Sequence, residues 1–207
     1  GFLSENPDFA ERTTQAGLAF IGPTAATIRL MGDKSEAKRN AIAAGVPVAL
    51  GTDGPLRDFD EAISEAERIG YPVMVRPSYV LGGRGMEVVY DPENLTKYMD
   101  AAVGVTPDRP ILIDRFLNHA MECEADAISD GTHAFVPAVM EHIELAGVHS
   151  GDSACIIPSR HISEKNVKTI KEYTRKIAEE MGVKGLMNMQ YAIENDKVYV
   201  LEANPRA

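Results

Sequence analysis

The last residues of the chain combine oxygen ligands for a hard metal ion with an arginine for an anion. Glu202 and Asn204 lie two positions apart in an apparent strand, so their side chains point to the same face. Gln190 precedes Glu202 by twelve positions. Carboxylate and amide oxygens are ligands that Mg²⁺ takes when protein and phosphate share its coordination, and Arg206 adds a planar fork for an anionic oxygen. The pattern predicts a site where a nucleotide triphosphate meets a small acid.

These side chains can meet only if the closing hairpin has the right register. We expect strands at residues 186–194 and 197–202, joined by an Asn-Asp turn. A three-residue loop centred on Asp196 would place Gln190 opposite Glu202, whereas a two-residue turn would place the pair one position out.

The alternative for this hairpin is a polar stripe that faces solvent. In that arrangement Glu202 and Asn204 would share one face with Val200, while the other face would carry Tyr199, Leu201 and Ala203. An apolar residue fits poorly in a solvent-facing stripe, so the pattern favours a functional site.

A glycine-rich segment at residues 78–85 lies between two predicted strands. Glycines let backbone N–H groups approach a phosphate closely, and successive amides form an anion nest. The segment lacks the Gly-Lys-Ser/Thr of a Walker A loop, and no helix is expected after it. Arg76 ends the preceding strand, where a buried arginine needs a partner such as phosphate. Phosphate binding is one interpretation, and a plain flexible turn is the other.

An apolar strand at residues 112–117 precedes Glu122. The backbone of such a strand can hydrogen-bond an adenine edge, while the nearby carboxylate takes ribose hydroxyl groups. Read alone, the segment fits better a core strand that leads into a solvated loop.

The loop at residues 140–153 is rich in histidines, acids and glycines. His142 and His149 do not have a helical zinc-binding spacing. His149 next to Ser150 could stabilise a developing phosphoryl or acyl oxyanion. A Ser-His-acid triad is a rival interpretation, but the chain lacks a Gly-x-Ser-x-Gly elbow. A polar surface loop without a catalytic or binding role is the other alternative.

Net charge, cysteine content and the length of apolar runs narrow the class of protein. The 207 residues carry a net charge of −10, which argues against a nucleic-acid partner. Cys123 and Cys155 have no ligand-like spacing, so we expect two free thiols. No apolar run approaches the roughly 18–20 residues that span a membrane, and no signal peptide opens the chain. We therefore expect a cytoplasmic protein, and the abrupt ends suggest a fragment of a larger one.

Periodicity and turn signals predict an α+β chain with interleaved hairpins and helices. Helices are expected at residues 4–16, 24–31, 33–44, 58–69, 93–103 and 163–181. Strands are expected at residues 18–21, 71–76, 86–90, 111–116, 122–129, 134–141, 186–194 and 197–202.

Together these segments resemble the ATP-grasp superfamily. Residues from about 59 to 207 resemble the second, carbamate-phosphorylating half of the large subunit of carbamoyl phosphate synthetase, through residues 70–84, 140–154, 188–190 and 202–206. Residues 1 to about 55 resemble biotin carboxylase, another ATP-grasp enzyme, through residues 1–6, 20–23, 28–34 and 45–55. The chain thus looks like a join of two relatives near residues 55–58, as a natural mosaic, an engineered chimera or a reconstructed sequence.

The resemblance implies an ATP-grasp fold with two α+β lobes and the nucleotide between them. It implies a remnant of a pre-ATP-grasp domain at residues 1–27 and linking helices at 28–49. A lid lobe would follow at 50–116 and a metal-bearing lobe, truncated at its C-terminus, at 117–207.

The resemblance also implies roles for individual residues. ATP would be contacted by Lys34, Arg76, Gly82, Gly83, Arg115, Leu117, Glu122, Gly147, Val148, His149, Ser150, Gln190 and Glu202. Mg²⁺ or Mn²⁺, with two ions expected, would be held by Gln190, Glu202 and Asn204. The catalytic residues would be His149 and Arg206.

The implied activity is transfer of the γ-phosphoryl group of ATP to a carboxylate-like oxygen, with carbamate as the favoured acceptor and bicarbonate as the alternative. An ATP-binding module without turnover is the alternative of another class, because both relatives continue beyond the position of Arg206. Biotin carboxylase would also carry a longer glycine run at residues 80–83. Expected partners are a small anionic acceptor and, in the full-length parent, a glutaminase small subunit and further large-subunit domains. Neither nucleic acid nor membrane is expected.

Overall fold

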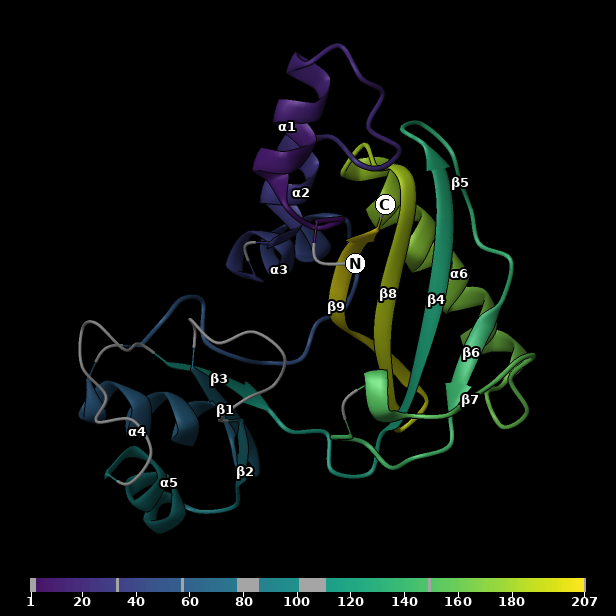
Figure 1. Cartoon of the computed structure of the whole chain (residues 1–207). Coiled ribbons are helices and arrows are strands. Elements are labelled where there is room, and N and C mark those ends of the chain that lie inside the picture. Colours follow the sequence, from purple (N-terminus) through teal and green to yellow (C-terminus); the bar gives the residue numbers. More distant parts are fainter. Residues whose placement is uncertain are drawn as a thin grey trace. The chain divides into compact units, whose positions relative to one another are not determined.

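The computed structural model describes residues 3–32, 34–56, 58–77, 86–100, 111–148 and 150–206 (Figure 1). The chain forms two compact units. Unit 1 comprises Gly1–Val48 and His119–Ala207, and unit 2 comprises Ala49–Asn118. The predicted glycine-rich loop at 78–85 and the end of the predicted helix at 93–103 lie outside the described residues.

Unit 1 is built on an antiparallel sheet in the order β7-β6-β4-β8-β9, with β5 paired to β4. Its strands are β4 (Met121–Asp130), β5 (Ala134–Phe135), β6 (Val139–His142), β7 (Cys155–Ile156), β8 (Lys184–Glu194) and β9 (Lys197–Arg206). The long central strands β4 and β8 pair along their length, from Met121 opposite Ile193 to Asp130 opposite Lys184. This sheet carries the three predicted metal ligands, Gln190, Glu202 and Asn204, and the predicted nucleotide residue Glu122.

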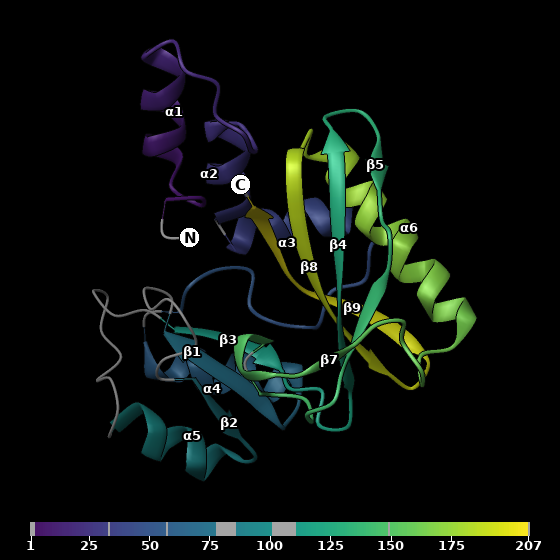
Figure 2. The same ribbon diagram turned by 45° about the vertical axis from the view of Figure 1, so that its right-hand side comes forward.

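One face of this sheet is covered by helix α6 (Glu164–Glu180), as Figure 2 shows. The helix begins where the Ser163 side chain accepts a hydrogen bond from the Asn166 backbone N–H, a standard N-cap. Strand residues at alternate positions supply the apolar face beneath it, and they are Cys123, Ala125, Ala127, Met187, Met189 and Tyr191. Tyr191 is fully buried, and its hydroxyl lies 2.7 Å from the hydroxyl of Thr174 in α6. We call this the covered face.

Three helices precede the sheet in unit 1: α1 (Pro7–Gln15), α2 (Ala25–Gly32) and α3 (Lys34–Ala43). The predicted strand at residues 18–21 between α1 and α2 is wrong. In the described structure this segment pairs with no strand, and Leu18 and Ile21 are 65% and 86% exposed. An apolar run becomes a strand only when a neighbouring strand takes its backbone hydrogen bonds, which local pattern does not reveal.

The predicted strand at residues 134–141 is divided in two. β5 ends at Phe135 and β6 begins at Val139. Pro137 lies in the gap, and proline lacks the N–H that a continuous ladder needs.

The closing hairpin has a two-residue turn, so the three-residue loop considered from the sequence is wrong. Asn195 and Asp196 both adopt positive φ, 51° and 60°, as a tight hairpin turn requires. Pairing runs regularly to Tyr191 opposite Val200, and then Gln190 lies opposite Glu202. The extra residue between them forms a β-bulge, which moves the pairing by one position and brings Gln190 opposite Glu202 after all.

The bulge also separates Val200 from the acidic face. Val200 lies opposite Tyr191 and belongs to the core under α6. Glu202 lies opposite Gln190, on the other face. The alternative stripe, in which Val200 would share a face with Glu202 and Asn204, is therefore not the arrangement of this hairpin.

Unit 2 contains a three-stranded antiparallel sheet in the order β2-β1-β3. Its strands are β1 (Val73–Pro77), β2 (Glu87–Val89) and β3 (Ile111–Arg115), and its helices are α4 (Phe59–Ile69) and α5 (Pro92–Tyr98). Asp58 and Asp91 cap the two helices through their carboxylates. The helices and strands share one core, formed by Ala62, Ala66, Val73, Val75, Leu95, Ile111 and Ile113 among others.

The cysteines agree with the expectation from their spacing. Cys123 is buried and Cys155 exposed, and both are free thiols. Burial raises the pKa of the Cys123 thiol to about 12, so it behaves as an inert core residue. None of the helices in the described ranges is both long and apolar enough to cross a membrane.

Candidate functional site

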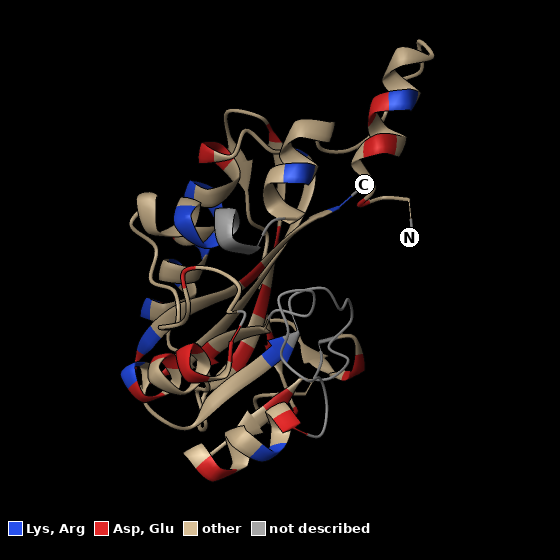
Figure 3. Ribbon diagram, turned by 90° about the vertical axis from the view of Figure 1, so that its left-hand side faces the viewer, with Lys and Arg blue, Asp and Glu red and all other residues tan. Residues whose placement is uncertain are grey.

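The face of the unit 1 sheet opposite α6 carries polar side chains in rows that run across β4, β8 and β9. We call it the open face. One row consists of Glu124, Gln190 and Glu202, and the next consists of Asp126, Asn188 and Asn204. Figure 3 shows acidic residues in red recurring along these strands. The same pleat that turns apolar side chains toward α6 therefore turns these polar ones away from it.

The predicted metal ligands lie together in these rows. Gln190 is directly opposite Glu202, and Asn204 lies two residues further along β9 on the same face. The donor set is one carboxylate and two amides, all hard oxygens. No cluster of three or more His, Cys, Asp or Glu side chains suited to a metal occurs within the described ranges. A Mg²⁺ ion here would need further oxygens, which phosphate groups and water supply in nucleotide sites.

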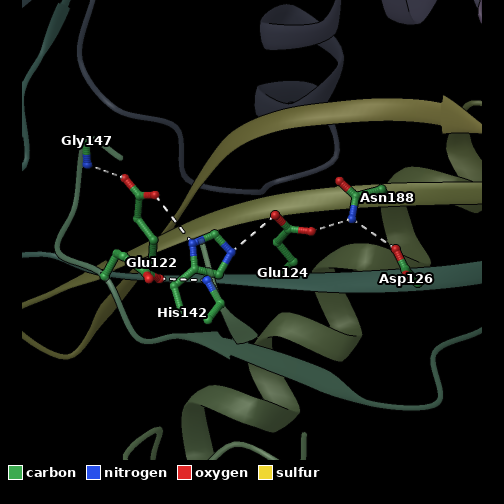
Figure 4. Close-up of polar contacts among 8 residues, drawn as sticks. Glu122, Glu124, Asp126, His142, Gly147 and Asn188 are labelled. Carbon is green, nitrogen blue, oxygen red and sulfur yellow. Dashed lines mark hydrogen bonds and ion pairs between the residues drawn. The ribbon is translucent and has the colours of Figure 1, made fainter. Parts of the chain in front are cut away.

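Glu122 and Gly147 also meet in unit 1 (Figure 4). The Gly147 backbone N–H donates to Glu122 Oε1, with an N···O distance of 2.9 Å. Burial raises the pKa of Glu122, and the Gly147 hydrogen bond offsets part of that increase. Val148 follows Gly147 with its side chain partly exposed. Ser150 begins the short 3₁₀ helix Ser150–Asp152, while the Ser150 side chain and His149 lie outside the described part of the chain.

A hydrogen-bonded network that sequence reasoning missed lies next to Glu122 on the open face and joins His142, Glu124, Asn188 and Asp126. His142 Nε2 lies 3.1 Å from Glu124 Oε1. The Asn188 side-chain amide donates to Glu124 Oε2 and to Asp126 Oδ1, at 2.9 Å each. The sequence signal that could have revealed the network is the alternation of acids at 122, 124 and 126 within an apolar strand.

Two atoms of this network are buried without a hydrogen-bond partner among the described residues, His142 Nδ1 and Asn188 Oδ1. A buried polar atom left unpaired costs about 1–3 kcal/mol. Native structures contain few such atoms, and they are often found where a ligand, water or ion supplies the missing partner.

The remaining predicted nucleotide contacts belong to unit 2. Arg76 lies on β1, Arg115 ends β3, and Leu117 follows β3 as a buried residue. Arg76 forms an ion pair with Asp114, with an N···O distance of 2.6 Å. The Nε atom of Arg76 is buried without a hydrogen-bond partner among the described residues. This arginine therefore has donor capacity left for an anion.

Four other predicted residues are Arg206, Lys34, Gly82 and Gly83, and the structure describes the side chain of Arg206 alone among them. Arg206 forms an ion pair with Glu5 from the N-terminal segment of unit 1. Lys34 begins α3, but its side chain lies outside the described part of the structure. Gly82 and Gly83 also lie outside the described residues.

The fold is that of an ATP-grasp domain. Over the whole chain it matches the biotin carboxylase from Campylobacter jejuni in complex with β,γ-ATP, with a TM-score of 0.88, 28% identity and 47% of that chain covered. It also matches the biotin carboxylase domain of 2-oxoglutarate carboxylase from Hydrogenobacter thermophilus, in complex with MgADP, ADP and bicarbonate, with a TM-score of 0.85, 28% identity and 47% coverage of that chain.

The chain belongs to the family described as carbamoyl-phosphate synthase L chain, ATP binding domain, whose model matches residues 33–207. The model of the biotin carboxylase N-terminal domain matches residues 1–28. These matches confirm the predicted resemblance and fold class. The two models meet between residues 28 and 33, which lies before the join expected near residues 55–58.

Curated relatives are large chains of carbamoyl phosphate synthase. The one from Methanothermobacter thermautotrophicus is 51% identical over 196 residues, which cover 93% of this chain and 18% of the relative. The one from Methanobrevibacter smithii is 56% identical over 156 residues, which cover 74% of this chain and 15% of the relative. The chain thus spans less than a fifth of the length of these relatives.

Proposed function

We propose that this chain binds ATP with Mg²⁺ and transfers the γ-phosphoryl group to a carboxylate-like oxygen, with carbamate as the favoured acceptor. The observation that carries the proposal is the pairing of Gln190 with Glu202 on the same open face as Glu122. It is supported by the family match and by the names of the curated relatives, which are carbamoyl phosphate synthase large chains.

Each predicted residue has a defined task in this proposal. Gln190, Glu202 and Asn204 would hold Mg²⁺, which when bound neutralises charge on the phosphate oxygens. Glu122 would accept hydrogen bonds from the ribose hydroxyl groups. Arg76 has an unpaired, buried Nε that would serve a phosphate.

The transfer itself needs little covalent chemistry from the protein. The bond from the γ-phosphorus to ADP breaks while a bond to the acceptor oxygen forms, so positioning and charge stabilisation supply most of the rate. His149 and Arg206 are the residues proposed to face the transferred group and the acceptor.

Bicarbonate is the alternative acceptor. It is supported by the H. thermophilus relative, whose structure contains bicarbonate together with MgADP. ATP binding without turnover is the alternative of another class. It is supported by the ion pair of Arg206 with Glu5, because an arginine held by a carboxylate has less capacity for an anionic acceptor. A glutaminase small subunit and further large-subunit domains stay predicted partners of the larger protein.

A coupled assay of ADP release separates these possibilities. Carbamate and bicarbonate are supplied in turn to the chain with MgATP, and ADP formation above the rate without acceptor is expected with carbamate. Glu202→Ala is expected to abolish it, whereas Glu180→Ala, an exposed acid at the end of α6, is the matched control and retains it. ATP binding without ADP release under either acceptor would contradict phosphoryl transfer and would support the alternative, an ATP-binding module without turnover.

A further inference from the structure

Two carboxylates flank the ring of His142 on the open face (Figure 4). Nε2 lies 3.1 Å from Glu124 Oε1, and Nδ1 lies 3.7 Å from Glu122 Oε2. The His142 side chain is 2% exposed, so bulk water does not compete for these contacts. A carboxylate can only accept hydrogen bonds, so the ring presents an N–H at Nε2 toward Glu124.

The two sides of the ring differ in how firmly they are held. On one side Glu124 is anchored, because its other oxygen accepts a hydrogen bond from the Asn188 amide. On the other side Nδ1 has no hydrogen-bond partner in the described structure, and 3.7 Å exceeds hydrogen-bond distance. The imidazole is thus held through Nε2 by Glu124, and its other nitrogen, Nδ1, faces Glu122.

We propose that His142 is a positioning residue that sets the Glu122 carboxylate for the ribose hydroxyl groups of the nucleotide. The inference rests on the proposed function, in which Glu122 accepts those hydroxyl groups. Gly147 holds one Glu122 oxygen through its backbone N–H, and His142 limits where the second oxygen can lie. The Gly147 hydrogen bond fixes one oxygen and the buried imidazole restricts the space for the other, so together they orient the carboxylate and its lone pairs.

Such positioning has a consequence for ligand selectivity. A ligand without ribose hydroxyl groups leaves the second oxygen of a largely buried carboxylate without a hydrogen bond from the ligand, and sites built to hydrogen-bond a hydroxyl reject analogues that lack it. If His142 no longer holds Glu122 in place, this carboxylate can turn away, and the penalty against the analogue disappears.

The test compares binding of MgATP and of its 2′,3′-dideoxy analogue by isothermal titration calorimetry. The readout is the ratio of the two dissociation constants, because a general loss of structure weakens both ligands and leaves the ratio unchanged. The variants are His142→Gln and His142→Asn. The glutamine amide nitrogen replaces Nε2 toward Glu124, and the asparagine amide nitrogen replaces Nδ1 toward Glu122. Glu122→Gln is the reference for loss of the carboxylate.

In the unmodified chain the ratio is expected to favour ATP by roughly tenfold or more, the value of a hydrogen bond to a charged group. His142→Gln is expected to reduce it to that of Glu122→Gln, and the double variant to reduce it no further. His142→Asn is expected to retain part of the discrimination.

The possible negative results distinguish a failure of the proposed function from a failure of the inference about His142. If neither nucleotide binds the unmodified chain, the proposed function fails and the role of His142 fails with it. If ATP binds with no preference over the analogue, Glu122 does not read the ribose and the inference is overturned. If the preference exists and His142→Gln keeps it in full, only the inference about His142 is overturned.

Discussion

The two faces of the unit 1 sheet are made by the same strands but differ in how completely their buried polar groups are hydrogen-bonded. On the covered face the Tyr191 hydroxyl meets Thr174, and Glu141 accepts hydrogen bonds from the backbone N–H groups of Arg160 and His161. On the open face two buried atoms, His142 Nδ1 and Asn188 Oδ1, have no such partner in the described structure. These polar groups of the covered face complete their hydrogen bonds within the chain, whereas the two atoms of the open face leave capacity for a ligand.

Two glutamates on neighbouring strands, Glu141 on the covered face and Glu122 on the open face, show the same difference between the faces. Burial alone would raise the pKa of Glu141, but hydrogen bonds from the His161 backbone and ring and the Arg160 backbone together hold it below its usual value. Burial raises the pKa of Glu122, and a single backbone N–H offsets only part of it. The difference indicates that the open face gives up stability in the unliganded chain, as binding sites commonly do.

The largest expected difference is between neighbouring residues of β8 that point to opposite faces. Tyr191→Ala empties a fully buried site under α6 and is expected to lower the free energy of unfolding by about 3–5 kcal/mol. Gln190→Ala, on the open face, is expected to change it by less than about 1 kcal/mol. Urea denaturation followed by circular dichroism measures both values. Equal losses in the two variants would mean that the faces do not differ as described.

Glu141→Gln is expected to lower the free energy of unfolding by about 1.5–3 kcal/mol at pH 7, because hydrogen bonds to a charged acceptor are replaced by bonds to a neutral one. The pKa of Glu141 is lowered in the folded chain, so its contribution is present above the ordinary value of 4.5 and is lost as pH falls through the folded value. Denaturation curves from pH 7 to pH 3 should therefore converge with those of the unmodified chain. A constant difference across this range would contradict the assignment.

Glu122→Gln is expected to act in the opposite direction, raising the free energy of unfolding by about 0.5–1 kcal/mol at pH 7. The pKa of Glu122 is raised in the folded chain, so the ionised form is penalised at neutral pH, and the penalty shrinks as pH falls through the folded value and is gone below the ordinary value of 4.5. The gain should shrink under acid conditions. A variant that is less stable at pH 7 would show that Glu122 is a structural group.

Much of the fold follows from local sequence rules, and the register of the site does not. The helix predicted at residues 163–181 and the predicted Asn-Asp turn both lie where the sequence places them. The segment at 18–21 was predicted wrongly because pairing depends on a neighbour that no local pattern supplies. The bulge that aligns Gln190 with Glu202 carries no local signal of that kind.

The network around Glu124 shows why the site was found only in part. The motifs lead to Gln190, Glu202 and Glu122, which are close in sequence to recognisable segments. Glu124 is hydrogen-bonded to His142 and Asn188, which lie 18 and 64 residues away along the chain. Only the pairing of β4 with β6 and β8 brings these side chains together, so tertiary structure is needed to reveal them.

The most direct test of the account is how much MgATP stabilises the folded chain. Binding to the folded state alone adds about 2.7 kcal/mol to the free energy of unfolding when the ligand is at a hundred times its dissociation constant. We predict this increase for the unmodified chain, its loss when Mg²⁺ is removed with a chelator, and its absence in Glu202→Ala. An equal increase in Glu202→Ala, or an increase that does not depend on Mg²⁺, would contradict the claim that the open face holds the metal and the nucleotide.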